Sequence, residues 1–173
     1  MNDTLVSRLE PLHTDAFGWA LHCCDGAHAE AADVLQNAYL KVLQKKVIFR
    51  EHSVLKTWWF GVIRLTAKEE ARRRQFRESL PGKILRLCFI ETEATSSESK
   101  SLLESDESAC QLKACLAQLP ARQAEVLHLV FYQDLSLTEA AIIMGVSIGS
   151  ARTHYERAKA RLRMLLQPSA TDV

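Results

Sequence analysis

The sequence predicts an all-α protein made of two small helical domains, and three observations support this fold class. Apolar residues recur at helical spacing in both halves of the chain, no stretch alternates well enough to indicate a strand, and a polar, acidic segment separates the halves. With 173 residues, 47% of them apolar, the chain is long enough for two small cores. We expect domains at residues 1–89 and 109–167, a flexible linker at 90–108 and a tail at 168–173.

The first domain is expected to begin with two helices between residues 6 and 45, separated by a turn at Asp25-Gly26. Their apolar positions are Phe17, Leu21, Val34, Leu35, Ala38, Tyr39, Val42 and Leu43. A polar loop and then a long helix follow in FREHSVLKTWWFGVIRLTAKEEARRRQF, whose apolar positions are Leu55, Trp58, Trp59, Val62, Ile63 and Ala67. Adjacent aromatic residues cannot share one helix face, so we expect Trp59 and Ile63 to be buried and Trp58 to lie nearer the surface.

The second domain is expected to contain a helix-turn-helix. Pro120 starts a helix that ends near Asp134, and two shorter helices follow in LTEAAIIMGVSIGSARTHYERAKARL. Gly145 can adopt the positive φ that ends the first of these, and Ser147 can cap the second. The small residues Ala141 and Gly145 would let the two helices cross closely.

The last helix would have an inward apolar stripe and an outward basic face. The stripe is Ala151, Tyr155, Ala158 and Leu162, and the outward residues are Ser150, Arg152, Thr153, Glu156, Arg157, Lys159 and Arg161. Such a face suits a DNA major groove, where Arg can bind guanine edges with two hydrogen bonds. The alternative is an αα-hairpin whose basic face is only solvated.

Charge is unevenly distributed, although the net charge is only +1. Two segments are basic: residues 41–86 carry thirteen basic and four acidic residues, and residues 120–167 carry six basic and four acidic residues. The other two are acidic: residues 1–40 carry one basic and six acidic residues, and residues 87–119 carry two basic and six acidic residues. Two basic blocks separated by an acidic one indicate two contacts with a polyanion such as nucleic acid.

Other classes of protein find little support in the sequence. The five cysteines form no CxxC pair, which argues against a disulfide framework or a zinc ribbon, and we expect the His22-Cys23-Cys24 run with His28 to be helix residues. No metal site and no cofactor are predicted. Because neither a long apolar window nor a signal peptide is found, we expect a cytoplasmic protein without membrane insertion. No motif of an enzyme, such as HExxH or GxSxG, occurs.

Two sets of motifs, in this order, resemble the extracytoplasmic-function sigma factors, which are small bacterial transcription initiation factors. In the first domain, DVLQ and AYL are similar to that family's polymerase-binding helix, and FR, LKTW and the arginine run are similar to its minus-ten-reading segment. In the second domain, LPARQ, EVL, LS, TEAA, GVSIGSAR and RAKARL are similar to its fourth conserved region. The resemblance covers nearly the whole chain except the linker.

The resemblance implies a transcription initiation factor with no catalytic activity of its own. Residues 1–89 would be the region 2 domain, which binds core RNA polymerase through its beta and beta-prime subunits and helps to melt the promoter. Residues 109–167 would be the region 4 domain, which reads the minus-35 element. An anti-sigma factor would be a further partner.

The resemblance also implies residues for each contact. Core polymerase would be bound by Glu30, Asp33, Gln36 and Asn37. The minus-ten element would be read by Arg50, His52, Lys56, Thr57, Trp58, Arg64, Arg72 and Arg73, with residues 50–54 capturing a flipped base. The minus-35 element would be read by Arg122, Ser147, Ser150, Arg152, Thr153, His154, Glu156, Arg157, Lys159 and Arg161.

Aromatic rings beside basic side chains can stack unpaired bases for about 1–3 kcal/mol per base. Trp58, Trp59 and Phe60 beside Lys56 and Arg64 offer this chemistry, although the alternative is that at least two of the rings belong to the core.

The chain departs from the family pattern at four positions. Ala32 and Asn37 stand where an acidic pair is usual, Leu65 where Asn is common, and Glu156 where a neutral or aromatic residue is expected. The alternative function is a free-standing helix-turn-helix regulator with an N-terminal dimerisation domain, which would leave the aromatic and basic helix without a purpose.

Overall fold

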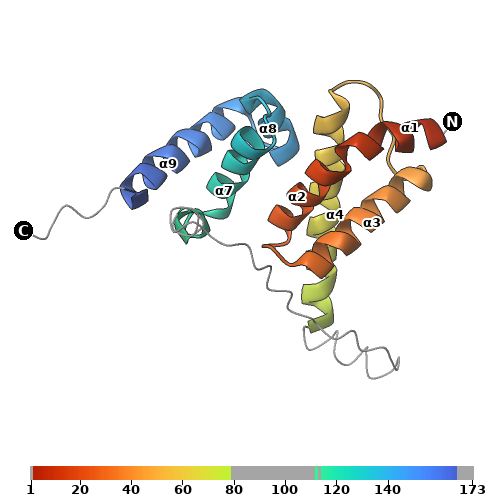
Figure 1. The fold of residues 1–173 in the computed structure, drawn as a ribbon, viewed down its shortest axis with the longest axis horizontal. Helices are drawn as coiled ribbons and strands as arrows, with labels where there is room; N and C mark the ends of the chain where they lie inside the picture. Colours follow the sequence, from red (N-terminus) through yellow and green to blue (C-terminus); the bar gives the residue numbers. More distant parts are fainter. Residues whose placement is uncertain (1, 79–111, 113, 167–173) are drawn as a thin grey trace, which may run out of the picture. The chain divides into compact units, whose positions relative to one another are not determined.

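The computed structural model describes residues 2–78, 112 and 114–166, and within these ranges helices are the regular secondary structure and no strand is present (Figure 1). The all-α prediction is therefore confirmed. The chain divides into two compact units, Met1–Ser99 and Lys100–Val173. The expected linker and tail lie outside the described residues, and the exact domain boundaries stay predictions.

The N-terminal unit contains four α-helices and one 3-10 turn in its described part. In chain order these are α1 (Asn2–Leu9), η1 (Glu10–Leu12), α2 (His13–Cys23), α3 (His28–Leu43) and α4 (Leu55–Glu78). Asp25 and Gly26 have positive φ angles of 52° and 84°, and the Gly26 amide donates to the Leu21 carbonyl at 2.8 Å. The predicted break at Asp25-Gly26 is confirmed.

The core of the N-terminal unit forms where α2, α3 and α4 pack against one another. Trp19 of α2 stacks on Phe60 of α4 with ring centroids 6.0 Å apart, and its Nε1 donates to the Phe60 carbonyl at 3.0 Å. Trp59 and Ile63 are fully buried and Trp58 is half-buried, as predicted. Two of the three adjacent aromatic rings, Trp59 and Phe60, therefore belong to the core.

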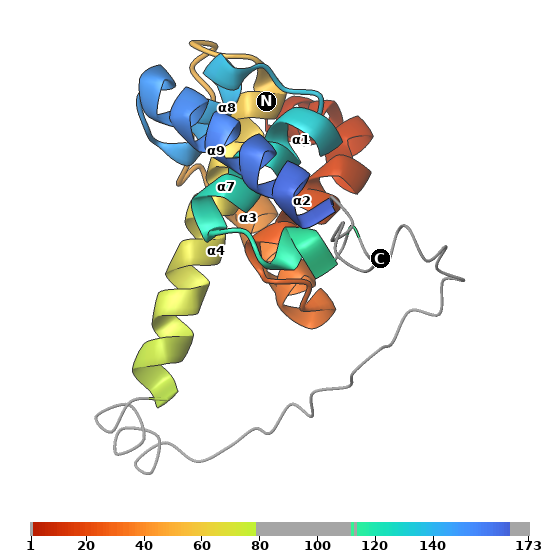
Figure 2. The same ribbon diagram turned by 90° about the vertical axis from the view of Figure 1, so that its left-hand side faces the viewer.

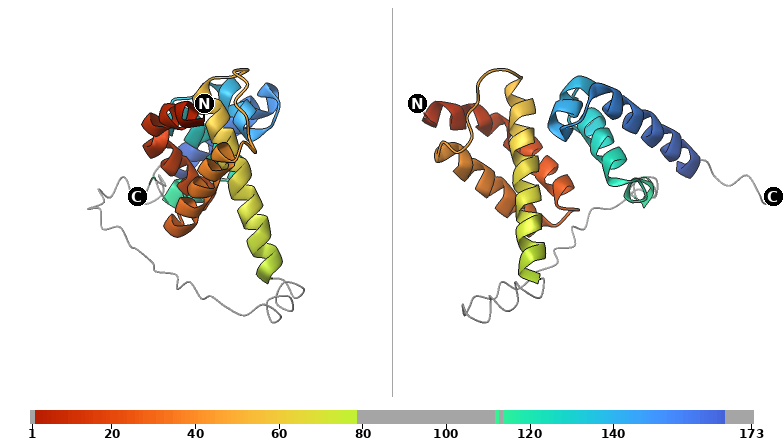
Figure 3. Two further views of the ribbon diagram at one scale, coloured as in Figure 1. Left: turned by 90° about the vertical axis from the view of Figure 1, so that its right-hand side faces the viewer. Right: turned by 180° about the vertical axis from the view of Figure 1, so that it is seen from behind.

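The buried surface of α4 is wide because α2 and α3 cover it from two sides. Trp59 and Ile63 define one buried stripe. A second buried stripe consists of Thr57, Phe60, Arg64 and Ala67, which follow one another at intervals of three or four residues. The final turns of α4 extend past α2 and α3 (Figure 2, Figure 3). Arg72 and Arg73, which lie in these final turns, are exposed.

The C-terminal unit is built around α9. Residues 114–117 are helical, and the further elements are α7 (Ala121–Leu127), the π-helical turn η2 (His128–Tyr132), α8 (Leu137–Met144) and α9 (Ile148–Leu166). Both α7 and α8 pack on α9. The core residues include Leu119, Leu127 and Ala158, with Tyr155 and Leu162 packed against them. Ala151 is also fully buried, so the predicted inward stripe of α9 is confirmed.

The turn between α8 and α9 has the predicted local chemistry. Gly145 has a φ of 65° and ends α8, and Ser147 Oγ accepts from the Ser150 amide at 3.1 Å at the start of α9. A Cβ at Gly145 would meet no atom within 4 Å. The expectation that Gly145 makes room for a close helix crossing is therefore wrong, because the position needs glycine for its backbone angle and not for space.

Helix α8 starts with a reciprocal cap. Ser136 Oγ accepts from the Glu139 amide at 3.3 Å, and Glu139 Oε2 accepts from the Ser136 amide at 2.9 Å. Two amides that lack partners inside the helix are thus satisfied by side chains.

Replacing this cap tests how much the helix-turn-helix depends on it. Ser136→Ala should lower the free energy of unfolding of the C-terminal unit by about 1 kcal/mol, because one amide loses its acceptor. Urea unfolding of the full chain followed at the tyrosines of this unit would measure the loss. Ser136→Thr is the matched control and should keep most of the stability. Equal stability of all three proteins would contradict the assignment.

Candidate nucleic-acid and polymerase interfaces

The outward face of α9 begins in the first turns after the Ser147 cap. Ser150, Arg152, Thr153 and Arg157 are exposed there, and His154 is half-buried. The Thr153 hydroxyl donates to the Gly149 carbonyl at 2.9 Å, so its oxygen is left as an acceptor. These sequence-predicted residues thus lie around the buried stripe of a capped helix, on its exposed surface.

Lys159 and Glu156 of the same helix form an ion pair of 2.9 Å, and the Lys159 ammonium lies 4.4 Å from the centroid of the Tyr155 ring. Lys159 is therefore half-buried and held along the helix, whereas Arg161 is exposed. The pair offsets part of the negative charge of Glu156 at the one acidic position of this face. Because the Glu156 side chain is largely exposed, the pair contributes little to stability.

Arg122 of α7 lies beside the turn that precedes α9. Its guanidinium donates to the Met144 carbonyl at 3.3 Å and to Glu125 Oε2 at 3.1 Å. A cation at the last carbonyls of α8 is favourable for the helix dipole. Arg122 thus joins α7 to the end of α8, while its side chain stays exposed enough to reach a phosphate.

The outward face of α4 differs from the predicted one. Its residues are spaced three or four apart and consist of Trp58, Gly61, Leu65, Lys68 and Arg72, with Leu65 59% exposed. Two residues expected to contact DNA are instead in the core, since Thr57 is 1% exposed and Arg64 is 5% exposed. They lie on the stripe that packs under the neighbouring helices, so their side chains are not available to DNA in this structure.

Lys68 is a residue that the sequence reasoning missed. It lies ten residues after Trp58 and on the same outward face, and this spacing could have indicated it. Arg73, which was predicted, is exposed and pairs with Glu70 of its own helix at 2.9 Å.

Lys56, at the first turn of α4, is tied to another helix. Its ammonium lies 2.8 Å from Asp15 Oδ2 of α2 and 5.5 Å from the centroid of the Phe60 ring. Lys56 is half-buried as a result. A phosphate that contacts Lys56 would have to compete with the Asp15 carboxylate.

The exposed face of α3 carries two of the four residues expected to bind polymerase. Asp33 and Gln36 are exposed, and Leu40 and Leu43 continue the same face at 41% and 47% exposure. Leu43 belongs to the apolar pattern of the sequence, and the structure places it on the exposed face. The face therefore combines one carboxylate, one amide and two apolar side chains.

The other two expected polymerase contacts, Glu30 and Asn37, are engaged with α4. Glu30 forms an ion pair with Arg74, and the Asn37 side-chain amide donates to Glu70 Oε1 at 3.4 Å. These contacts join the first ten residues of α3 to the second half of α4. Their first role in this structure is to hold α3 on α4.

The loop between α3 and α4, residues 44–54, presents several exposed groups. Arg50 and His52 are exposed, as the prediction requires, and the apolar side chains of Ile48 and Val54 are exposed beside them. The backbone at Glu51 is left-handed, with a φ of 58°. Such a loop offers both apolar and hydrogen-bonding contacts to a base.

Two titratable side chains of this unit, the half-buried Tyr39 and the buried Cys24, remain neutral at physiological pH. Burial raises the pKa of the Tyr39 hydroxyl, and the nearby Glu10 carboxylate raises it further. Burial also raises the pKa of the Cys24 thiol, an effect that Arg74 opposes and Asp25 reinforces. Neither group adds a charge to the faces described above.

Comparison with known proteins agrees with this arrangement. The family model described as "Sigma-70, region 4" matches residues 111–162, which include the helix-turn-helix. The ECF RNA polymerase sigma factor EcfG of Rhodopseudomonas palustris is 29% identical over 79% of this chain and 71% of its own length. RNA polymerase sigma factor YlaC of Bacillus subtilis is 29% identical over 84% of this chain and 83% of its own length.

A solved structure resembles the chain over almost its full length. The sigma factor RpoE of Bartonella quintana, crystallised with the anti-sigma factor NepR, is 27% identical, has a TM-score of 0.69 and covers 98% of this chain and 99% of its own. The chain is similar to extracytoplasmic-function sigma factors across both of its units. Those sigma factors form a family of transcription factors without enzymatic activity. CnrH, solved with the cytosolic domain of CnrY, shares the fold with a TM-score of 0.63 at 16% identity.

None of the helices in residues 2–78 or 114–166 combines the length and the apolar character needed to cross a bilayer.

Proposed function

We propose that this chain is a sigma factor that binds core RNA polymerase, directs it to specific promoters and helps to open them. The observation that carries the proposal is the outward face of α9, where Arg152, Thr153 and Arg157 are exposed on a helix that the Ser147 side chain caps. A helix of this kind fits the major groove, and its first turns are the part that reaches base edges.

Within this face, we assign base contacts to the first turns of α9 and phosphate contacts to the later ones. Arg152 and Thr153 would meet base edges of the minus-35 element, and Arg157, Lys159 and Arg161 would meet phosphates. An acidic residue is tolerated at position 156 because Lys159 offsets the charge of Glu156. The Glu156 carboxylate can also accept a hydrogen bond from a cytosine amine.

The N-terminal unit would read the minus-ten element with the outward face of α4 and the loop of residues 44–54. Trp58 supports a stacked base, while Lys68 and Arg72 neutralise phosphates beside it. We leave Thr57 and Arg64 out of the DNA contact because they are buried. Separating base pairs costs on the order of 1.4 kcal/mol per stacking step. The base stacking on Trp58, the contacts of the loop and the contacts of the polymerase with DNA must together offset this cost.

The polymerase contact would be made by the exposed face of α3. Asp33 and Gln36 supply polar contacts to the beta and beta-prime subunits, and Leu40 and Leu43 supply apolar area. An anti-sigma factor is the third partner that we propose, because the similar RpoE was crystallised with one. The site of action is then the cytoplasm, and the chain itself catalyses no reaction.

The alternative function, a free-standing regulator with an N-terminal dimerisation domain, is not favoured. The sigma factors EcfG and YlaC match this chain across both of its units. A dimerisation domain would also leave the outward face of α4 without a ligand.

Run-off transcription tests the proposal. Purified core polymerase would be given genomic fragments of the organism that encodes the chain, with and without the protein. Discrete new transcripts that require the chain are expected. Transcripts identical to those of core polymerase alone would overturn the proposed function.

A further inference from the structure

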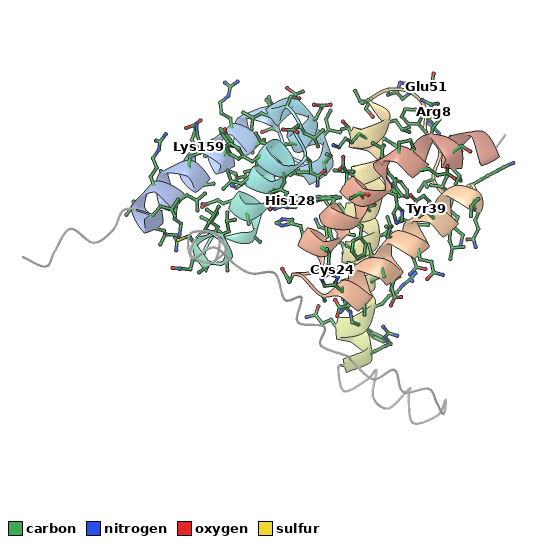
Figure 4. The ribbon with its side chains drawn as sticks, in the orientation of Figure 1. Arg8, Cys24, Tyr39, Glu51, His128 and Lys159 are labelled. Carbon is green, nitrogen blue, oxygen red and sulfur yellow. The ribbon has the colours of Figure 1, made fainter. Side chains whose placement is uncertain are left out.

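The loop of residues 44–54 has a partner outside the surfaces described above, the side chain of Arg8 in α1. The Arg8 guanidinium lies 3.8 Å from Glu51 Oε1 and 5.7 Å from the centroid of the Phe49 ring. Figure 4 shows Arg8 and Glu51 close together, one from α1 and the other from the loop. The next residue, Leu9, is fully buried, so the end of α1 that carries Arg8 is anchored in the core.

The loop is also supported from its other side. The Phe49 ring lies 5.2 Å from the ring of Trp58, the first outward aromatic residue of α4. Arg8, Phe49 and Trp58 therefore form a continuous series of contacts from α1 through the loop to the face of α4. Glu51 holds a left-handed backbone conformation, which a residue with a side chain rarely adopts unless its surroundings maintain it.

We propose that Arg8 is a positioning residue for base capture by this loop. It keeps Phe49 and Glu51 in place, so that the exposed groups of the loop meet a flipped base in a formed pocket. The inference rests on the proposed function, because it assumes that the loop reads the minus-ten strand.

The physical reason is the cost of ordering the loop. A base leaves its stack at a cost of a few kcal/mol, which only a pocket that already exists can recover. A loop that must first become ordered uses part of its binding free energy for that ordering. Arg8 reduces this cost through a cation–π contact with Phe49 and an ion pair with Glu51, without touching the base itself.

The experiment measures base preference position by position. Holoenzyme assembled from core polymerase and the full chain would be incubated with a pool of single-stranded DNA carrying a randomised ten-nucleotide window, and the bound DNA would be sequenced. Arg8→Ala should lower the preference at one position by roughly two- to fivefold and leave the others unchanged. Arg8→Lys should retain part of the preference because it keeps the charge. Ser7→Ala, an exposed neighbour on α1, is the matched control.

A second variant keeps the test independent of any effect on α1. Glu51→Gln removes the carboxylate from the loop itself and should weaken the same position as Arg8→Ala. The double variant should be no worse than the stronger single one, because both remove the same contact. Losses that add, or that fall at different positions, would contradict the proposal.

The outcomes also separate this inference from the proposed function. If wild-type holoenzyme selects no sequence beyond what core polymerase selects, the proposed function fails. If the wild type selects a sequence and Arg8→Ala selects it equally well, only the positioning role is overturned. A loss spread evenly over all positions would also overturn it, because it would make Arg8 a direct phosphate contact.

Discussion

Asp33→Arg is expected to abolish the binding of core RNA polymerase while leaving the N-terminal unit folded. Asp33 is exposed on α3, so its replacement disturbs no core contact. In our account it faces basic residues of the polymerase, and the reversed charge would be repelled by them. Close charge pairs at interfaces couple by about 1.5–7 kcal/mol, so loss of the pair alone predicts at least a roughly tenfold loss of affinity, to which the repulsion adds. A binding titration with immobilised core polymerase would measure it.

A matched control separates charge from position. Glu10→Arg makes the same change at an exposed acid of η1 in the same unit and should leave polymerase binding nearly unchanged. Glu30→Arg is not a clean control because it would break the ion pair with Arg74 and loosen α3 from α4. If Asp33→Arg binds core polymerase as the wild type does, the exposed face of α3 is not the docking surface.

Base and phosphate contacts of α9 should separate on mutation. Arg152→Ala should cost about 1–3 kcal/mol of holoenzyme affinity and relax the preference at one upstream position, since Arg152 is exposed just after the capped first turn. Arg157→Ala should weaken binding to all sequences alike and reduce the slope of log affinity against log salt by about one. Titrations of duplex promoter fragments at several salt concentrations would measure both effects.

Arg163→Ala is the control for this pair. Arg163 is an exposed arginine in the last turns of α9, beyond residues 111–162 that match region 4. Its removal should change little. Sequence-blind losses of equal size from Arg152→Ala and Arg157→Ala would contradict the division of roles.

Features fixed by neighbouring residues were predictable from the sequence. Gly145 and Ser147 act within one turn of the chain, and the structure shows the backbone angle and the cap that they predict. The cap formed by Ser136 and Glu139 could also have been predicted from the sequence, because it follows the S-x-x-E pattern. The burial of Trp59 followed from the rule that adjacent helix residues point to different sides.

Features that depend on packing between distant segments were not predictable. Arg64 looks like a DNA contact in a basic sequence, yet α4 is covered from two sides and this residue falls on a covered stripe. Asn37 and Glu70 are 33 residues apart in the chain and meet only because α3 packs on α4. The contact between Arg8 and Glu51 has the same origin. The spacing of apolar residues predicts which sides of a helix are apolar, but not how many neighbouring helices pack on it.

A mobility-shift titration of duplex promoter DNA, with and without core polymerase, tests the central claim most directly. Alone, the chain should bind weakly and with strong salt dependence, because α9 offers only a few basic side chains and the minus-ten face needs a separated strand. With core polymerase, it should give an opened bubble in which unpaired thymines react with permanganate. Tight, sequence-specific binding by the isolated protein at physiological salt, unaffected by polymerase, would contradict the account.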